Sequence, residues 1–110
     1  MDINSTLTAF GALGQETRLE VFRLLVKAGD KGLLAGEIGE KLNVKQNTMS
    51  ANLAALLHAD LVRNERQGRT IRYFANFETL KGLLGFLMED CCGGRPELCQ
   101  PVIDEIACAC

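Results

Sequence analysis

The chain has 110 residues, a hydrophobic fraction of 47%, a charged fraction of 24% and a formal net charge of −2. These values fit one small globular domain, and no apolar run approaches the roughly 18 residues of a membrane-spanning helix. The first residues, MDINSTLTAF, lack the cationic and apolar segments of a secretory signal, so we expect a cytoplasmic protein with no membrane partner.

Two helices are predicted in the first thirty residues. An apolar residue recurs every three or four positions over residues 4–13, which predicts a short helix capped by Asn4 or Ser5. A stronger apolar stripe over residues 16–28 has acids in its first turn and a lysine in its last turn. It predicts a core helix that Gly29 terminates.

Two more helical segments follow and are separated by only two residues. A short apolar repeat predicts one helix over residues 35–42, and a longer repeat predicts another over residues 45–59. Asn43 and Val44 can form the turn between them, because asparagine tolerates a positive φ. Two helices joined in this way are typical of a helix-turn-helix motif.

Beyond this motif the apolar residues alternate, which predicts strands over residues 61–66 and 70–76 around a turn at residues 67–69. A hairpin in this place is typical of a wing. Residues 77–90 then return to a helical pattern. We therefore expect a mostly α-helical fold with one small β-hairpin (α+β), forming a winged helix-turn-helix domain for DNA binding and dimerisation over residues 1–90.

The predicted last helix has an unusually broad apolar face, with Gly82 and Gly85 as small residues on it. A terminal helix this apolar favours a partner subunit, and the small residues would allow a close helix approach. The alternative is that the face only covers the core of its own domain.

Charge is distributed unevenly along the chain. Residues 41–73 have a net charge of +4, and residues 74–110 have a net charge of −4. The basic positions of the first segment are Lys41, Lys45, Arg63, Arg66, Arg69 and Arg72. A local basic surface on such a motif is what contact with DNA phosphates requires, and an acidic remainder does not prevent that contact.

Double-stranded DNA is therefore the predicted partner. We expect the start of the second helix of the motif to enter the major groove, where amide and hydroxyl side chains read base edges. Arginines of the wing would contact phosphates or enter the minor groove. The candidate DNA-binding residues are Lys45, Gln46, Asn47, Thr48, Ser50, Asn52, Arg63, Arg66, Arg69 and Arg72. The alternative is that these side chains form an ordinary solvated surface.

Three segments of this chain resemble the ArsR/SmtB family of winged-helix metalloregulatory repressors: ALGQETRLEVFRLL (residues 12–25), EIGEKLNVKQNTMSANLAALLHADLV (37–62) and RQGRTIRYF (66–74). The similarity covers about residues 5–90. It implies a homodimer, joined through the first and last helices, that binds a palindromic operator and releases it when an inducer binds. It also implies that Gln46, Thr48, Ser50 and Asn52 approach DNA and that Arg69 and Tyr73 belong to the wing.

The chain departs from this family in the helix before the recognition helix. Many arsenic-sensing relatives carry ELCVCDL there, whereas this chain reads LLAGEIGEKL at residues 33–42 and has no cysteine in that stretch. Zinc sensors of the family use aspartate and histidine on the last helix, and the predicted last helix here has no histidine. His58 is expected to be a surface or DNA-adjacent group, so sensing must occur elsewhere.

All five cysteines lie in the last twenty residues. Cys91 and Cys92 are adjacent, and two glycines after them let the backbone reverse, so Cys99 can approach the pair. The CC and CAC spacings suit neither a disulfide framework nor two CxxC zinc knuckles, and in a reducing cytosol the thiols would be free. Three thiolates suit a soft ion such as As(III) or Sb(III), whereas zinc would need a fourth ligand.

This cysteine cluster resembles that of arsenic-responsive family members with a Cys-Cys pair and a third cysteine just past the last helix. The predicted metalloid ligands are therefore Cys91, Cys92 and Cys99, in a cysteine-rich sensing tail over residues 91–110. Cys108 and Cys110 are candidates for a second metal or redox site.

We therefore expect a transcriptional repressor that binds operator DNA as a homodimer and dissociates when As(III), or Sb(III), binds. The alternatives are a sensor of methylated arsenicals, zinc, cadmium or thiol oxidation, and a metal-sequestering thiol protein that does not bind DNA. An enzyme is not expected, because the sequence shows no glycine-rich phosphate loop, no histidine near a nucleophile and no evident carboxylate pair.

Overall fold

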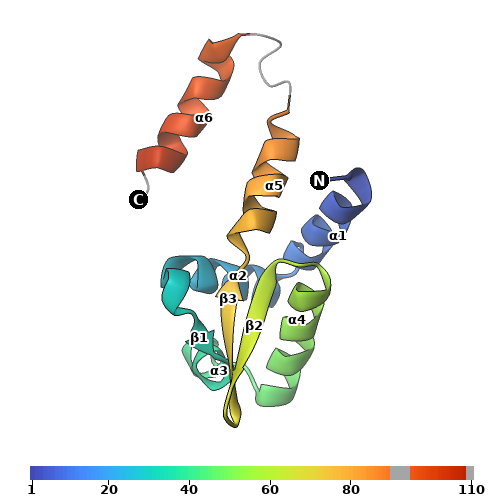
Figure 1. Cartoon of the computed structure of the whole chain (residues 1–110), viewed down its shortest axis with the longest axis vertical. Coiled ribbons are helices and arrows are strands. Elements are labelled where there is room, and N and C mark those ends of the chain that lie inside the picture. Colours follow the sequence, from blue (N-terminus) through green and yellow to red (C-terminus); the bar gives the residue numbers. More distant parts are fainter. Residues whose placement is uncertain (90–94, 109–110) are drawn as a thin grey trace.

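The computed structural model describes residues 1–89 and 95–108 and confirms the predicted fold class. Six α-helices, one 3₁₀ turn and three short strands alternate along the described chain, and Figure 1 shows their arrangement. The elements are α1 (Ile3–Leu13), α2 (Glu16–Ala28), η1 (Gly29–Lys31), β1 (Leu33–Leu34), α3 (Ala35–Leu42), α4 (Gln46–His58), β2 (Val62–Gln67), β3 (Thr70–Ala75), α5 (Phe77–Leu87) and α6 (Pro96–Cys108).

The first two helices begin with side-chain caps. Asp2 caps α1, because its carboxylate accepts a hydrogen bond from the Ser5 amide at 2.7 Å. The prediction of Asn4 or Ser5 as the cap was wrong, since the helix starts at Ile3 and the group that can reach its free amides is one residue before it. The bounds of α2 agree with the prediction, and Gly29 ends it with a φ of 63°.

The helix-turn-helix is formed by α3 and α4. Asn43 adopts the left-handed conformation, with φ 54° and ψ 49°, as predicted. The Val44 amide then donates a hydrogen bond to the Gly39 carbonyl at 3.0 Å. A Cβ on Gly39 would lie 3.2 Å from the Val44 carbonyl oxygen, so a glycine there lets the turn close tightly. The second helix starts at Gln46, one residue later than predicted, with Lys45 at its cap position.

The strands form one antiparallel sheet in the order β1-β3-β2. The predicted hairpin is confirmed: β2 and β3 pair from Val62 opposite Ala75 to Gln67 opposite Thr70, and Gly68 supplies the positive φ of the turn. The two-residue strand β1, which pairs with β3, was not predicted. Two residues are too few to show an alternating pattern.

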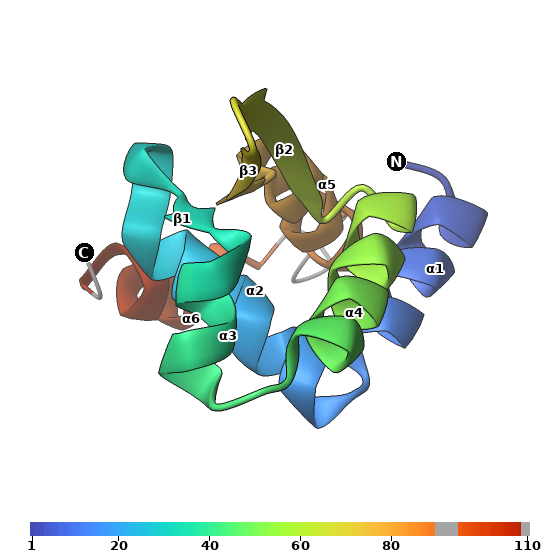
Figure 2. The same ribbon diagram turned by 90° about the horizontal axis from the view of Figure 1, so that it is seen from below.

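The core lies where α2, α3 and α4 pack against the sheet. Its largest fully buried side chains are Leu25, Ile38, Met49, Leu53, Leu56, Leu61 and Val21. This single core fixes the recognition helix α4 relative to the wing. Figure 2 looks onto the end of the molecule where α3, α4 and the hairpin come together.

The last two helices extend away from this core (Figure 1). The helix α5 ends at Leu87, before the predicted end at residue 90, which lies outside the described residues. A further helix, α6, was not predicted; it begins at Pro96 and contains Pro101. Within the part of the chain that the structure describes, no helix is long and apolar enough to cross a membrane.

Candidate nucleic-acid interface

The first turns of α4 present a row of polar side chains to solvent. Met49, Leu53 and Leu56 are buried and hold the helix against the core. The exposed residues on the other side of these turns are Lys45, Gln46, Asn47, Thr48 and Ser50. Five of the predicted DNA-binding residues are therefore accessible at the N-terminal end of α4. The free backbone amides at this end of a helix also favour a nearby phosphate.

Asn52 differs from these residues because it is half-buried and its amide is already bonded. Its Nδ2 donates to the Thr48 carbonyl at 3.1 Å, and its Oδ1 accepts from Arg18 Nη1 at 3.5 Å. The Arg18 guanidinium also donates from Nε to the Ala12 carbonyl at 2.6 Å. Sequence reasoning did not single out Arg18, which links the end of α1 to the recognition helix.

Two of the four wing arginines are held against the protein. The Arg63 guanidinium lies 4.3 Å from the centroid of the Phe74 ring, its cross-strand neighbour, and is 3.7 Å from a Glu65 carboxylate oxygen. Arg72 donates to Gln67 Oε1 and to the Lys31 carbonyl, each at 3.1 Å. These contacts orient both guanidinium groups toward neighbours within the domain.

Arg66 and Arg69 lie nearest the tip of the wing and are exposed. Among the described residues, neither has a hydrogen bond or an ion pair. Arg69 follows Gly68 in the turn, and Arg66 stands opposite Ile71. Because their charges are not compensated by a neighbour, these two arginines are the wing cations best placed to meet DNA phosphates.

Helices α1 and α5 carry apolar side chains that the rest of the described domain does not cover. On α1, Leu7 is 62% exposed, and on α5, Leu87 is 58% exposed. The other large apolar residues exposed on these two helices include Ile3, Phe10, Phe77 and Leu84. These faces belong to the first helix and to the helix after the wing, which are the helices that the family resemblance implies at a dimer interface.

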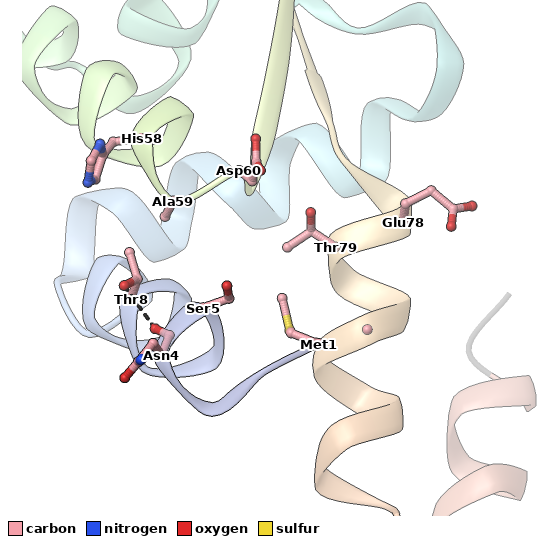
Figure 3. Close-up of a pocket in the computed structure, with 10 residues that line it drawn as sticks. Met1, Asn4, Ser5, Thr8, His58, Ala59, Asp60, Glu78 and Thr79 are labelled. Carbon is pink, nitrogen blue, oxygen red and sulfur yellow. Dashed lines mark hydrogen bonds between the residues drawn. The ribbon is translucent and has the colours of Figure 1, made fainter.

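A hollow of about 560 Å³ lies between α1, the end of α4 and the start of α5 (Figure 3). His58, Asp60 and Glu78 line it, and Figure 3 shows His58 and Glu78 on opposite sides. Across all described residues, no group of three or more histidine, cysteine, aspartate or glutamate side chains is placed to hold a metal ion. His58 itself is exposed at the end of α4.

Only part of the predicted thiol site can be placed. Cys91, Cys92 and Cys110 lie outside the described residues, and Cys108 is the last residue of α6. Cys99, in the first turns of α6, is 5% exposed and disulfide-bonded. Cys99 is therefore not the free thiol that the sequence predicts for a reducing cytosol, because its sulfur is oxidised to a disulfide.

Comparison with known proteins places these features in a family. A model described as a helix-turn-helix domain matches residues 13–65. The chain is 37% identical over 79 residues to the uncharacterized HTH-type transcriptional regulator YceK of Bacillus subtilis, covering 71% of this chain and 78% of that protein.

Two solved structures share the fold. The ArsR-like transcriptional regulator from Rhodococcus sp. RHA1 has a TM-score of 0.70 and 28% identity, covering 94% of this chain and 93% of that one. The homodimeric winged helix-turn-helix DNA-binding domain of Mb0332 from Mycobacterium bovis has a TM-score of 0.65 and 23% identity, covering 80% and 82%. Together with the polar start of α4 and the wing behind it, these similarities show that the chain belongs to the HTH-type transcriptional regulators and has a winged helix-turn-helix domain of the ArsR type.

Proposed function

We propose that this regulator is an arsenite-responsive repressor that binds operator DNA as a homodimer and releases it when As(III), or Sb(III), binds Cys91, Cys92 and Cys99. The observation that carries the proposal is the position of the thiols. Cys91 and Cys92 come soon after the end of α5, a helix with an uncovered apolar face, and Cys99 lies in the first turns of the next helix, α6. An ion bound there would act on the end of a dimerisation helix.

The DNA-binding half of the proposal is supported by the exposed start of α4 and by the wing. In a symmetric dimer, two recognition helices about 34 Å apart would enter successive major grooves of a palindromic site. Gln46, Asn47 and Ser50 would then read base edges, while Arg66 and Arg69 would contact phosphates. Asn52 would act mainly within the protein, because both ends of its amide are hydrogen-bonded to other residues.

Homodimerisation is supported by the exposed apolar faces of α1 and α5. Contiguous exposed apolar surface is uncommon on monomeric proteins and usually marks an interaction site. Leu7 on α1 and Leu87 on α5 are each more than half exposed although they belong to otherwise ordered amphipathic helices. A second copy of the chain, offering the same two faces, would cover them in an isologous interface.

The chemistry of the ion follows from the ligands. Thiolates are soft ligands, and three of them complete a trigonal site for As(III), whose lone pair fills the remaining direction. Because Cys99 is disulfide-bonded, its sulfur must be reduced to a thiol before it can ligate an ion. When As(OH)3 binds, three thiol sulfurs replace its three hydroxides, and the three thiol protons leave with the hydroxides as three waters.

The coupling between the two sites need not be large. Drawing the cysteines together around an ion would reorganise the end of α5 and alter the separation of the recognition helices. A difference of about 1–3 kcal/mol between the ion affinities of the free and the DNA-bound dimer, within the usual range for allostery, changes operator affinity by roughly 5- to 150-fold.

The experiment is a fluorescence anisotropy titration of the reduced dimer on the DNA upstream of its own gene, with and without arsenite. Cys91→Ser and Cys99→Ser should keep operator binding and lose release by arsenite. The matched control replaces Cys108 and Cys110 by serine, which leaves the proposed ligands intact and should leave release unchanged. Normal release of Cys91→Ser would remove that residue from the site. Failure of every variant and of the unmodified chain to bind any upstream DNA would contradict the repressor function.

A second candidate, sensing of thiol oxidation, is favoured by the disulfide of Cys99. The two inducers can be separated in the same assay. Release by diamide, but not by arsenite under reducing conditions, would favour an oxidation sensor. Release by arsenite in the presence of the non-thiol reductant tris(2-carboxyethyl)phosphine would favour the metalloid sensor. Parallel titrations with antimonite, methylated arsenicals, zinc and cadmium would rank the remaining ligands.

A further inference from the structure

A groove beside the candidate DNA-binding surface has apolar walls and carboxylates that the function proposed above does not use. It has a volume of about 500 Å³ and lies between α3, the recognition helix α4 and strand β3. Its apolar walls include Leu34, Leu53, Ala54, Leu57, Ile71 and Tyr73. This volume lies within the range of small-molecule sites, which are typically apolar with a few well-placed polar groups. Figure 2 shows the three elements that surround it.

Tyr73 supplies a polar group without a partner. The residue is only 7% exposed, and its hydroxyl makes no hydrogen bond to any residue that the structure describes. A buried tyrosine hydroxyl usually finds a hydrogen-bond partner. Among the described side chains, no fully buried nitrogen or oxygen atom lacks one, so this hydroxyl must reach open space. The groove is the open space that Tyr73 lines, so the hydroxyl is available to hydrogen-bond a ligand there.

The charges around the groove select the kind of ligand. Glu37 and Glu40, one turn apart on α3, both line it. Glu37 is held in place because its Oε1 accepts a hydrogen bond from the Leu34 amide at 2.8 Å. The one cation of the lining is Arg69, which is exposed, as is Glu40, whereas Glu37 is half-buried. Two carboxylates and one guanidinium give the charged groups of the lining a net charge of −1, which favours a positively charged guest.

We propose that this groove binds a small organic ammonium ion with an apolar body. The apolar body packs against Leu53, Leu57 and Ile71, and the ammonium group lies toward Glu37 and Glu40. Its N–H groups donate to the carboxylates or to the Tyr73 hydroxyl oxygen, and the Tyr73 ring adds a cation–π contact.

Such a ligand would compete with DNA. The lining also includes Gln46, Ser50 and Arg69, which are candidate DNA contacts, so an occupied groove and a bound operator would share the same side chains. This consequence rests on the proposed DNA-binding function. Ligand binding itself does not, because it requires only the groove.

The test titrates the full-length chain, without DNA, against two fluorescent probes of similar shape and opposite charge: 1-pyrenemethylammonium and 1-pyrenecarboxylate. Fluorescence anisotropy should show at least about tenfold tighter binding of the ammonium probe, which corresponds to about 1.4 kcal/mol. Glu40→Gln should reduce that preference several-fold, and Tyr73→Phe should weaken binding while keeping the ring. Ala54→Trp, which fills the groove from an exposed position on α4, should abolish binding.

The matched control is Glu20→Gln, which removes an exposed carboxylate from α2, outside the groove. It should bind both probes as the unmodified chain does, and thermal unfolding should show that each variant is folded. Equal affinity for the two probes, or unchanged binding by Ala54→Trp, would overturn the proposal. If the ammonium probe binds the free chain but leaves operator affinity unchanged, the groove still binds an ammonium ion, and only its competition with DNA is contradicted. If the chain binds no operator at all, only the proposed DNA-binding function is contradicted.

Discussion

The guanidinium of Arg18 lies between the last turn of α1 and the side chain of Asn52 on the recognition helix. Its Nε donates to the Ala12 carbonyl at 2.6 Å, and its Nη1 is 3.5 Å from Asn52 Oδ1. The two ends of this contact belong to different surfaces, because α1 presents the exposed Leu7 and α4 presents the exposed polar row that we propose to face DNA. One side chain thus joins the candidate dimer surface to the candidate DNA surface.

Replacing Arg18 by alanine should therefore affect both stability and DNA affinity. Loss of the hydrogen bonds should lower the free energy of unfolding by about 1–2 kcal/mol, measured by urea denaturation. Operator affinity should also decrease, because Asn52 loses the contact that positions α4 relative to α1. A double-mutant cycle with Asn52→Ala should give a non-additive free energy. Arg23→Ala, at an exposed position on the same helix, is the control and should change stability by less than about 0.5 kcal/mol. Strict additivity would contradict the link.

The wing arginines should separate into two classes. Arg69→Ala should weaken operator binding and reduce the magnitude of the salt slope, d log K/d log[salt], by about 0.9, the value for one lost phosphate contact. Arg63→Ala should leave the slope nearly unchanged and instead weaken the hairpin, because its guanidinium stacks on Phe74. Equilibrium binding at several salt concentrations distinguishes the two. Equal slopes for Arg69→Ala and the unmodified chain would remove Arg69 from the phosphate contacts.

Much of the fold could be predicted because the spacing of apolar residues along the sequence indicates helices and strands locally. The bounds of α2 and α3, the left-handed Asn43 and the hairpin around Gly68 all follow from apolar spacing and turn chemistry. The strand β1 is held by pairing with β3, which lies about forty residues away, so no local pattern marks it. The helix α6 was missed because Pro101 and the frequent cysteines oppose a helical prediction there.

The candidate site was predictable in composition but not in its internal contacts. The polar start of α4 and the basic wing can be read directly from residue types. Arg72 is hydrogen-bonded to the Lys31 carbonyl, which is 41 positions away in the sequence. Asn52 is hydrogen-bonded to Arg18, which is 34 positions away. Such contacts depend on how the helices pack, and they decide which polar residues remain available to DNA. The groove lined by Tyr73 likewise exists only after three elements have been brought together.

Gly32 should be one of the most sensitive positions outside the apolar core. Its φ is +60°, and a Cβ there would lie 2.5 Å from the Tyr73 carbonyl oxygen and 2.7 Å from the Phe74 ring. Gly32→Ala should therefore lower the free energy of unfolding by about 2 kcal/mol or more, measured by urea denaturation. Gly36→Ala is the matched control: a Cβ there meets nothing within 4 Å, and the gain in helix propensity should stabilise the chain by up to about 1 kcal/mol. Similar effects of the two substitutions would contradict the role assigned to Gly32.

Leu7 offers the clearest test of the dimer face. It lies 62% exposed on α1, so Leu7→Glu should leave the folded subunit intact and place a charge in the interface. Burying an unpaired carboxylate there should raise the dimer dissociation constant by about 100-fold or more. Sedimentation velocity at micromolar concentration should show monomers, with an unchanged circular dichroism spectrum and a reduced operator affinity. Lys27→Glu introduces the same acid at an exposed position of α2 and should remain dimeric. A Leu7→Glu protein that sediments as the unmodified dimer does would show that α1 lies outside the interface and that a different face, such as that of α5, joins the subunits.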